Sequence, residues 1–189
     1  VAPCGARRAG LGRARRLVAG ERGRDARPRG QRGDHVGPSP VDRGKPGSKI
    51  HAISDRQGLP LHVVVSAANV NDHRMLADVV DGIAPVKQPL GRPRKRPAKL
   101  HGDKGYDQRV SRALLAQRNI KARIARKGIE SSQRLGRHRY VIERCLQWIT
   151  RSRRLARRYE RKSSHFTAFA VAACVVICFR RADSLGLFT

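Results

Sequence analysis

The chain has 189 residues, 39% of them hydrophobic, which is enough for one folded domain with one apolar core. It contains 42 Lys and Arg against 14 Asp and Glu, a formal net charge of +28. A charge of this size opposes compaction and attracts a polyanion, so composition favours a nucleic-acid partner. Aromatic residues make up only 4% of the chain, which argues against an RNA-binding sheet that stacks bases on exposed rings.

Residues 1–33 differ from the rest of the chain. They contain ten Arg, seven Gly and six Ala, and no Lys, Ile, Ser, Thr or aromatic residue. No strand or helix period is visible there that could bury one face. We therefore expect a disordered basic arm that contacts the DNA backbone.

From Asp34 onward the pattern predicts regular structure joined by basic loops. Two alternating runs at 49–54 and 61–66 flank a turn-rich group at 55–58, which indicates a β-hairpin. The other expected elements are a helix over 72–83, a basic loop over 86–99, a strand ending at Asp103, a helix over 108–118, a strand over 121–125, a helix around Glu143 and a last helix over 163–181.

The last of these helices contains an apolar run at 166–179, flanked by arginines. Fourteen residues of helix reach only about 21 Å, against a hydrocarbon core of about 30 Å. We therefore expect a buried core helix and no membrane partner. No secretory signal is visible, and the four cysteines lack metal-ligand spacing, so we expect a cytoplasmic protein with reduced thiols.

The first candidate for chemistry is Asp103, in the run Lys-Leu-His-Gly-Asp-Lys-Gly-Tyr-Asp at 99–107. A carboxylate at the C-terminal end of a strand is held by the sheet while its oxygens stay accessible, which suits a magnesium ligand. A turn former or helix cap is the common alternative for an Asp in this position, and both readings stay open here.

The second candidate is Glu143, on a helix whose apolar residues cover one side. Arg139, Glu143 and Thr150 share a stripe next to that side. An ordinary ion pair between Arg139 and Glu143, four residues apart, would explain the spacing without any function. Trp148 belongs to the apolar side, so we expect it in the core rather than facing DNA.

Taken together, the Asp103 run and the Arg-x-x-x-Glu helix resemble the DDE transposases of bacterial insertion sequences. The likeness extends over about 33–181, and further segments agree with the family in order: 37–49, 66–69, 124–128 and 157–161. It implies an α/β fold with a ribonuclease H-like mixed sheet and flanking helices. It also implies DNA binding and metal-dependent strand cleavage and transfer, that is, transposition and recombination of a mobile element.

The resemblance assigns roles to individual residues. Asp103 and Glu143 would be catalytic metal ligands for Mg²⁺ or Mn²⁺, and Arg139, Arg151 and Lys104 would contact DNA. The partner would be double-stranded DNA at the element ends and the target, and a homodimer is compatible with this reading. We expect the protein at the bacterial nucleoid, with a catalytic domain over 34–182 and a tail over 183–189.

The family's first catalytic Asp belongs on the first, central strand, about fourteen residues before Gly37, where this chain has Gly23. Permitted codons can be chosen for the residues around Gly23 so that the same DNA, read one base later, encodes an Asp at this position. We therefore expect a chain that is N-terminally truncated and frame-shifted before about residue 33, with its central strand missing and cleavage impaired. Sequencing the coding DNA tests this hypothesis.

Four other carboxylates could replace the missing ligand, but none lies on a strand position that the family topology places beside Asp103. They are Asp42, Asp55, Asp72 and Asp107. The alternative function is a catalytically inactive, DNA-binding transposase remnant.

Overall fold

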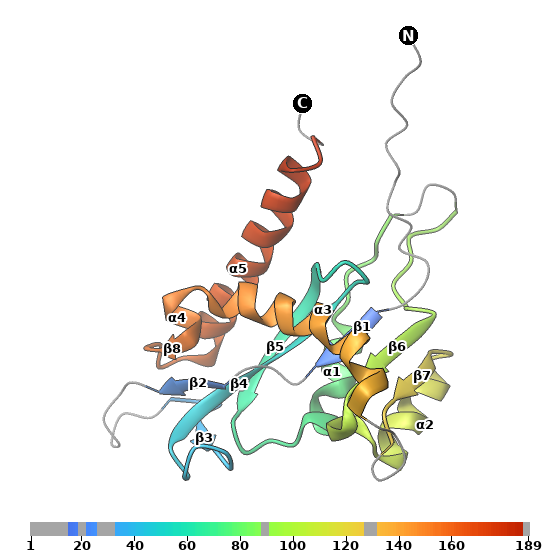
Figure 1. The fold of residues 1–189 in the computed structure, drawn as a ribbon. Helices are drawn as coiled ribbons and strands as arrows, with labels where there is room; N and C mark the ends of the chain where they lie inside the picture. Colours follow the sequence, from blue (N-terminus) through green and yellow to red (C-terminus); the bar gives the residue numbers. More distant parts are fainter. Residues whose placement is uncertain (1–14, 19–21, 26–32, 88–90, 127–131, 187–189) are drawn as a thin grey trace.

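The computed structural model describes residues 15–18, 22–25, 33–87, 91–126 and 132–186, with side chains over 33–87, 91–126 and 140–186. Its strands are β1 (Arg15–Val18), β2 (Arg22–Asp25), β3 (Gly37–Pro38), β4 (Pro46–Ser54), β5 (Pro60–Ala67), β6 (Lys99–Gly102), β7 (Lys121–Ile124) and β8 (Arg157–Arg158) (Figure 1). The helices are η2 (Asp72–Met75), α1 (Leu76–Asp81), η3 (Lys104–Tyr106), α2 (Arg109–Gln117), α3 (Ser132–Thr150), α4 (Arg153–Ala156) and α5 (Ser163–Asp183).

A mixed sheet forms the centre of the molecule. The predicted hairpin is confirmed, because β4 and β5 pair antiparallel with Ile50 opposite Val65. On the other side of the sheet, β6 and β7 run parallel, with Leu100 opposite Ala122. Helix α2 connects these two strands, as a parallel pair requires.

The central strand is present, so the prediction that it is missing is wrong. β1 pairs antiparallel with β4 and parallel with β6, and thereby joins the two halves of the sheet. β2 continues along β4 and pairs parallel with β8. The prediction of a disordered arm is likewise wrong for residues 15–18 and 22–25; the rest of 1–32 lies outside the described residues.

Alternate residues of β4 divide the core between the two faces of the sheet, because side chains along a strand point to opposite faces. Ile53 packs with α1 and α2 on one face, in a cluster that includes Leu100 and Tyr106. Ile50 and Ala52 pack on the other face against α3, α4 and α5. The result is three layers, with helices on both sides of the sheet.

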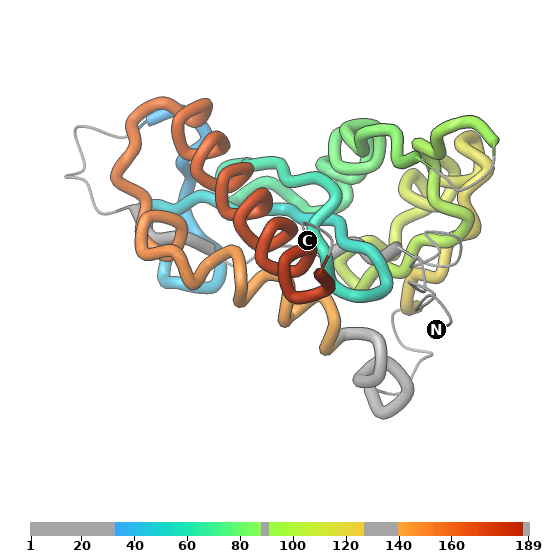
Figure 2. The backbone as a smooth tube through the Cα atoms, turned by 90° about the horizontal axis from the view of Figure 1, so that it is seen from above, coloured from blue at the N-terminus to red at the C-terminus, as the bar shows by residue number. Residues whose placement is uncertain are grey.

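Helix α5 is only partly a core helix. Phe166 and Ala170 in its first half are fully buried, whereas Val175 and Phe179 further along are 61% and 58% exposed. Figure 2 shows α5, in red, lying along β5, with which it is in contact. The prediction of a buried helix over 163–181 is therefore wrong for its second half. At 21 residues, α5 is by length and composition alone long and apolar enough to cross a membrane.

Candidate functional site

Asp103 lies directly after β6, as predicted. Its backbone is extended, and its Oδ1 accepts a hydrogen bond of 2.8 Å from the Gly105 N–H, which caps the short helix η3. The strand and the cap together fix the direction of the carboxylate. The capping role and a role as a metal ligand are therefore both consistent with the position of Asp103.

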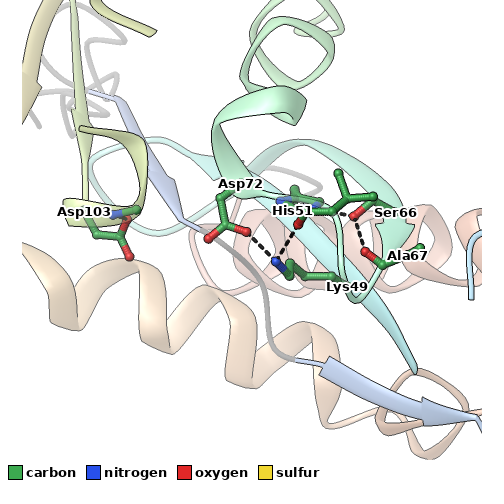
Figure 3. A network of polar contacts seen from close by, with 8 residues as sticks. Lys49, His51, Ser66, Ala67, Asp72 and Asp103 are labelled. Carbon is green, nitrogen blue, oxygen red and sulfur yellow. Dashed lines mark hydrogen bonds and ion pairs between the residues drawn. The ribbon is translucent and has the colours of Figure 1, made fainter. Parts of the chain in front are cut away.

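Asp72 lies beside Asp103, although a helix and a long loop separate the two residues in the sequence. A Cβ atom built on Gly105 would lie 3.0 Å from Asp103 Oδ1 and 3.2 Å from Asp72 Oδ2. The two oxygens are thus separated by no more than the sum of these distances. Figure 3 shows one Asp72 oxygen turned toward Asp103 and the other toward Lys49.

Lys49 on β4 holds Asp72 in this orientation. Its Nζ lies 2.6 Å from Asp72 Oδ1 and also donates a hydrogen bond of 2.9 Å to the Val70 carbonyl. Lys49 is only 4% exposed, and a buried ammonium group is costly unless it is paired. The ion pair therefore fixes both side chains and leaves Asp72 Oδ2 directed at Gly105.

The other three alternative carboxylates have evident structural roles. Asp107 pairs with Arg112 at 2.7 Å on α2. Asp55 accepts two backbone N–H groups in the hairpin turn, at 2.8 and 2.9 Å. Asp42 lies 3.9 Å from Lys45 in a surface loop. Of the four, Asp72 shares the surroundings of Asp103, and it does so from the helix η2 and not from a strand position.

Two buried polar atoms near this pair lack a hydrogen-bond partner in the described part of the chain. They are the Tyr106 hydroxyl and His51 Nδ1, both on residues with no exposed surface. Burial raises the pKa of Tyr106 well above its usual range, and the charges of Asp72 and Asp103 raise it further. Tyr106 therefore stays protonated and is a hydrogen-bond donor beside two carboxylates.

Burial lowers the pKa of His51 to about 4, even though the Asp72 charge opposes the shift. Its Nε2 lies 2.8 Å from Ser66 Oγ on β5, so the neutral ring is held between the two hairpin strands. The unfolded chain would bind a proton at its ordinary pKa of 6.5. The stability that neutral His51 contributes is therefore fully present above pH 6.5 and is lost as the pH falls toward 4.

We expect a measurable pH effect from this histidine. Lowering the pH from 7 to 5 should cost about 2 kcal/mol of unfolding free energy through His51, since each pKa unit corresponds to about 1.4 kcal/mol. Urea unfolding at both pH values should show that His51→Gln loses less stability than the unmodified chain. His165→Gln, at an exposed histidine, is the control, and equal losses in all three proteins would contradict the prediction.

Glu143 lies on α3 and is exposed, while Ile142 beside it is buried, as predicted for a residue at the border of the apolar face. Helix α3 contacts β1, the strand next to β6. The meeting of Glu143 and Asp103 at a shared ion stays a prediction. The side chain of Arg139 lies outside the described residues.

Trp148 is 37% exposed, so the prediction that it belongs to the core is wrong. The Arg144 guanidinium lies 4.9 Å from the ring centre of Tyr140 and 5.0 Å from that of Trp148. Arg144 also donates a hydrogen bond of 2.7 Å to the Gln57 carbonyl in the hairpin turn. The side chains of Tyr140, Arg144 and Trp148 thus form a stacked row on the outside of α3.

Several basic side chains lie at the surface of the molecule. Lys104 and Arg151, two of the predicted DNA contacts, are both exposed. The expected basic loop over 86–99 is held by an antiparallel bridge between Val86 and Arg94, and residues 88–90 lie outside the described chain. Basic side chains of this loop, together with Arg118, line a hollow of about 600 Å³. The members from the loop are Arg92, Arg94, Lys95 and Arg96.

Comparison with known proteins places the chain in a family. The family described as the transposase DDE domain matches residues 21–179, so the chain belongs to the DDE transposases. It is similar to two bacterial proteins named as insertion-sequence transposases. One, for element IS402 of Burkholderia cepacia, is 40% identical over 151 residues, covering 78% of this chain and 72% of that protein. The other, for element IS6501 of Brucella ovis, is 27% identical over 139 residues, covering 70% of this chain and 98% of that protein.

Proposed function

We propose that this chain is an insertion-sequence transposase that binds duplex DNA and acts on its strands with a divalent metal ion. The observation that carries this proposal is the position of Asp103 at the end of β6, inside the segment that matches the DDE family. The relatives named as insertion-sequence transposases support the same class of reaction. The bacterial nucleoid would be its place of action.

The order of elements supports a ribonuclease H-like sheet. With β1 in the central position, the chain continues as hairpin, helix, strand, helix, strand and helix. This is the order that the family resemblance implies. The sheet then places the end of β6 next to β1, where a family member would present two carboxylates side by side.

The donor set suits Mg²⁺ or Mn²⁺. Both ions prefer oxygen ligands, and magnesium needs few protein ligands because it keeps several waters. The gap at Gly105, which a Cβ atom would fill, has a carboxylate oxygen on two sides, and the orphaned Tyr106 hydroxyl lies nearby. No group of three or more potential ligands gathers within the described ranges.

In the proposed mechanism Asp103 and Glu143 would hold the metal, as the family resemblance implies. A bound divalent ion would supply the activation of water or a 3′-hydroxyl and the stabilisation of the leaving oxygen. Lys104, Arg151 and the basic loop would neutralise phosphates and hold the DNA strand, and Arg139 would orient Glu143. These basic contacts position the backbone without reading the bases.

Cleavage by this chain is impaired in our proposal. Continuing the parallel register, in which Arg16 lies opposite His101, places Val18 level with Asp103. Valine offers no metal ligand, and no residue of β1 is acidic. The second candidate, an inactive DNA-binding remnant, rests on this same observation.

DNA binding should be strong, weakly selective for sequence and very sensitive to salt. The excess of Lys and Arg displaces counterions from phosphates whatever the bases, so log K should fall with log salt with a slope of about −5 or steeper. Fluorescence anisotropy with two unrelated duplexes between 50 and 200 mM salt would measure it. Binding that does not change with salt would contradict the proposed function.

A further inference from the structure

We infer that Asp72 and Asp103 together bind a divalent cation, with Asp72 as a ligand from outside the central strand. This inference deepens the proposed function and rests on it. Asp72 follows the β4–β5 hairpin, whereas the family places the first carboxylate on the central strand. The site would therefore be built from an unusual part of the chain.

The gap between the two carboxylates is the first argument. Gly105 has no positive φ angle, so its backbone conformation would be open to other residues. Its missing side chain instead leaves the space between Asp72 Oδ2 and Asp103 Oδ1 open. Any larger residue would push a Cβ atom into contact with both oxygens.

Electrostatics is the second argument. Two carboxylates this close repel each other unless a cation lies nearby. Lys49 is fixed on the Oδ1 side of Asp72, whereas Asp72 Oδ2 faces Gly105. A divalent ion at the Gly105 gap would lie between the two carboxylates and reduce their repulsion.

The Tyr106 hydroxyl is an independent sign of a ligand site. It is completely buried, has no hydrogen-bond partner within the described ranges, and lies close enough to feel both carboxylate charges. A buried hydroxyl without a partner is destabilising, because it has lost its hydrogen bonds to water. A metal-bound water would give this hydroxyl a partner.

Lys49 has the role of a positioning residue. Its buried ammonium group ties Asp72 to the Val70 carbonyl and so keeps Asp72 Oδ2 directed toward the gap. Residues on β4 and η2 thus set the position of one ligand, while β6 and η3 set the other. Contacts between η2 and η3 bring the two parts together.

Manganese binding to the full chain tests the inference without relying on cleavage. The probe is free Mn²⁺, followed by electron paramagnetic resonance during titration. We expect one site in the unmodified chain and at least tenfold weaker binding in Asp72→Asn and in Asp103→Asn. Asp78→Asn removes the same charge from an exposed position six residues away and should change the affinity less than twofold.

Gly105→Ala is a second variant that keeps every charge. The added methyl group would fill the gap, so Mn²⁺ affinity should again fall at least tenfold, while circular dichroism without metal confirms that each variant is folded. Weaker binding in Asp103→Asn with full binding in both Asp72→Asn and Gly105→Ala would overturn the inference and leave a site of Asp103 and Glu143. Absence of Mn²⁺ binding in the unmodified chain would overturn the metal step of the proposed function as well.

Discussion

Replacing Arg158 with methionine should lower the free energy of unfolding by at least about 4 kcal/mol, a large part of the stability of a domain this size. Arg158 is completely buried, and its guanidinium donates hydrogen bonds to Ser48 Oγ and to several backbone carbonyls. Those carbonyls belong to Asp34, His35, Glu160 and Arg161. Methionine could donate none of these five hydrogen bonds, so it would remove all of them at once.

Arg157→Met is the matched control, because Arg157 is the exposed neighbour on the same strand β8. Urea unfolding followed by circular dichroism would compare the two variants with the unmodified chain. Arg157→Met should stay within about 0.5 kcal/mol of the unmodified chain, as surface substitutions usually do. If both variants were equally stable, the Arg158 network would contribute nothing and the prediction would be wrong.

The second large effect concerns strand cleavage. In magnesium, the unmodified chain should leave a plasmid that bears the element ends intact, and Val18→Asp should raise cleavage by at least about a hundredfold. Val18 is the β1 position level with Asp103, so an aspartate there would add the ligand that the family has on its central strand. Gel electrophoresis of nicked and linear products measures the gain.

Two further variants make this test specific. Adding Asp103→Asn to Val18→Asp should abolish the gained cleavage. Gly23→Asp places an aspartate fourteen residues before Gly37, where the family spacing predicts the first catalytic Asp. This variant should gain little cleavage activity, because Gly23 lies on β2, opposite Ser48 of β4 and away from the end of β6. Robust cleavage by the unmodified chain, abolished by Asp103→Asn, would show that Asp72 or another carboxylate already completes the site.

Local patterns were sufficient to predict the hairpin, the strand that ends at Asp103 and the helix of Glu143. Each of these depends on alternation or helical period within a short stretch, which the sequence displays directly. β1 was missed because Arg15, Arg16, Leu17 and Val18 have no alternating pattern. That strand forms because β4 and β6 offer hydrogen-bonding partners on both sides, which is an effect of tertiary context.

The site was only partly predictable for a related reason. Asp72 begins a helix and reads like an ordinary helix start, while its partner Lys49 is buried in a strand 23 residues earlier. Nothing in the local sequence of either residue indicates the pair. The apolar run of α5 was read as buried because hydrophobicity alone does not tell which side of a helix has a neighbour to pack against.

The position of β1 also has a consequence for the order in which the protein assembles. β1 lies near the N-terminus, yet its two partners β4 and β6 come about 30 and 80 residues later, at Pro46–Ser54 and Lys99–Gly102. During synthesis β1 leaves the ribosome before both partners, so its pairing with β4 must wait for β4 and its pairing with β6 must wait longer still. Pairing across such separations is slow, because the intervening chain must close as a loop before the strands can bond. The hairpin of β4 and β5 would therefore form early, and insertion of β1 between β4 and β6 would be the late step that closes the sheet.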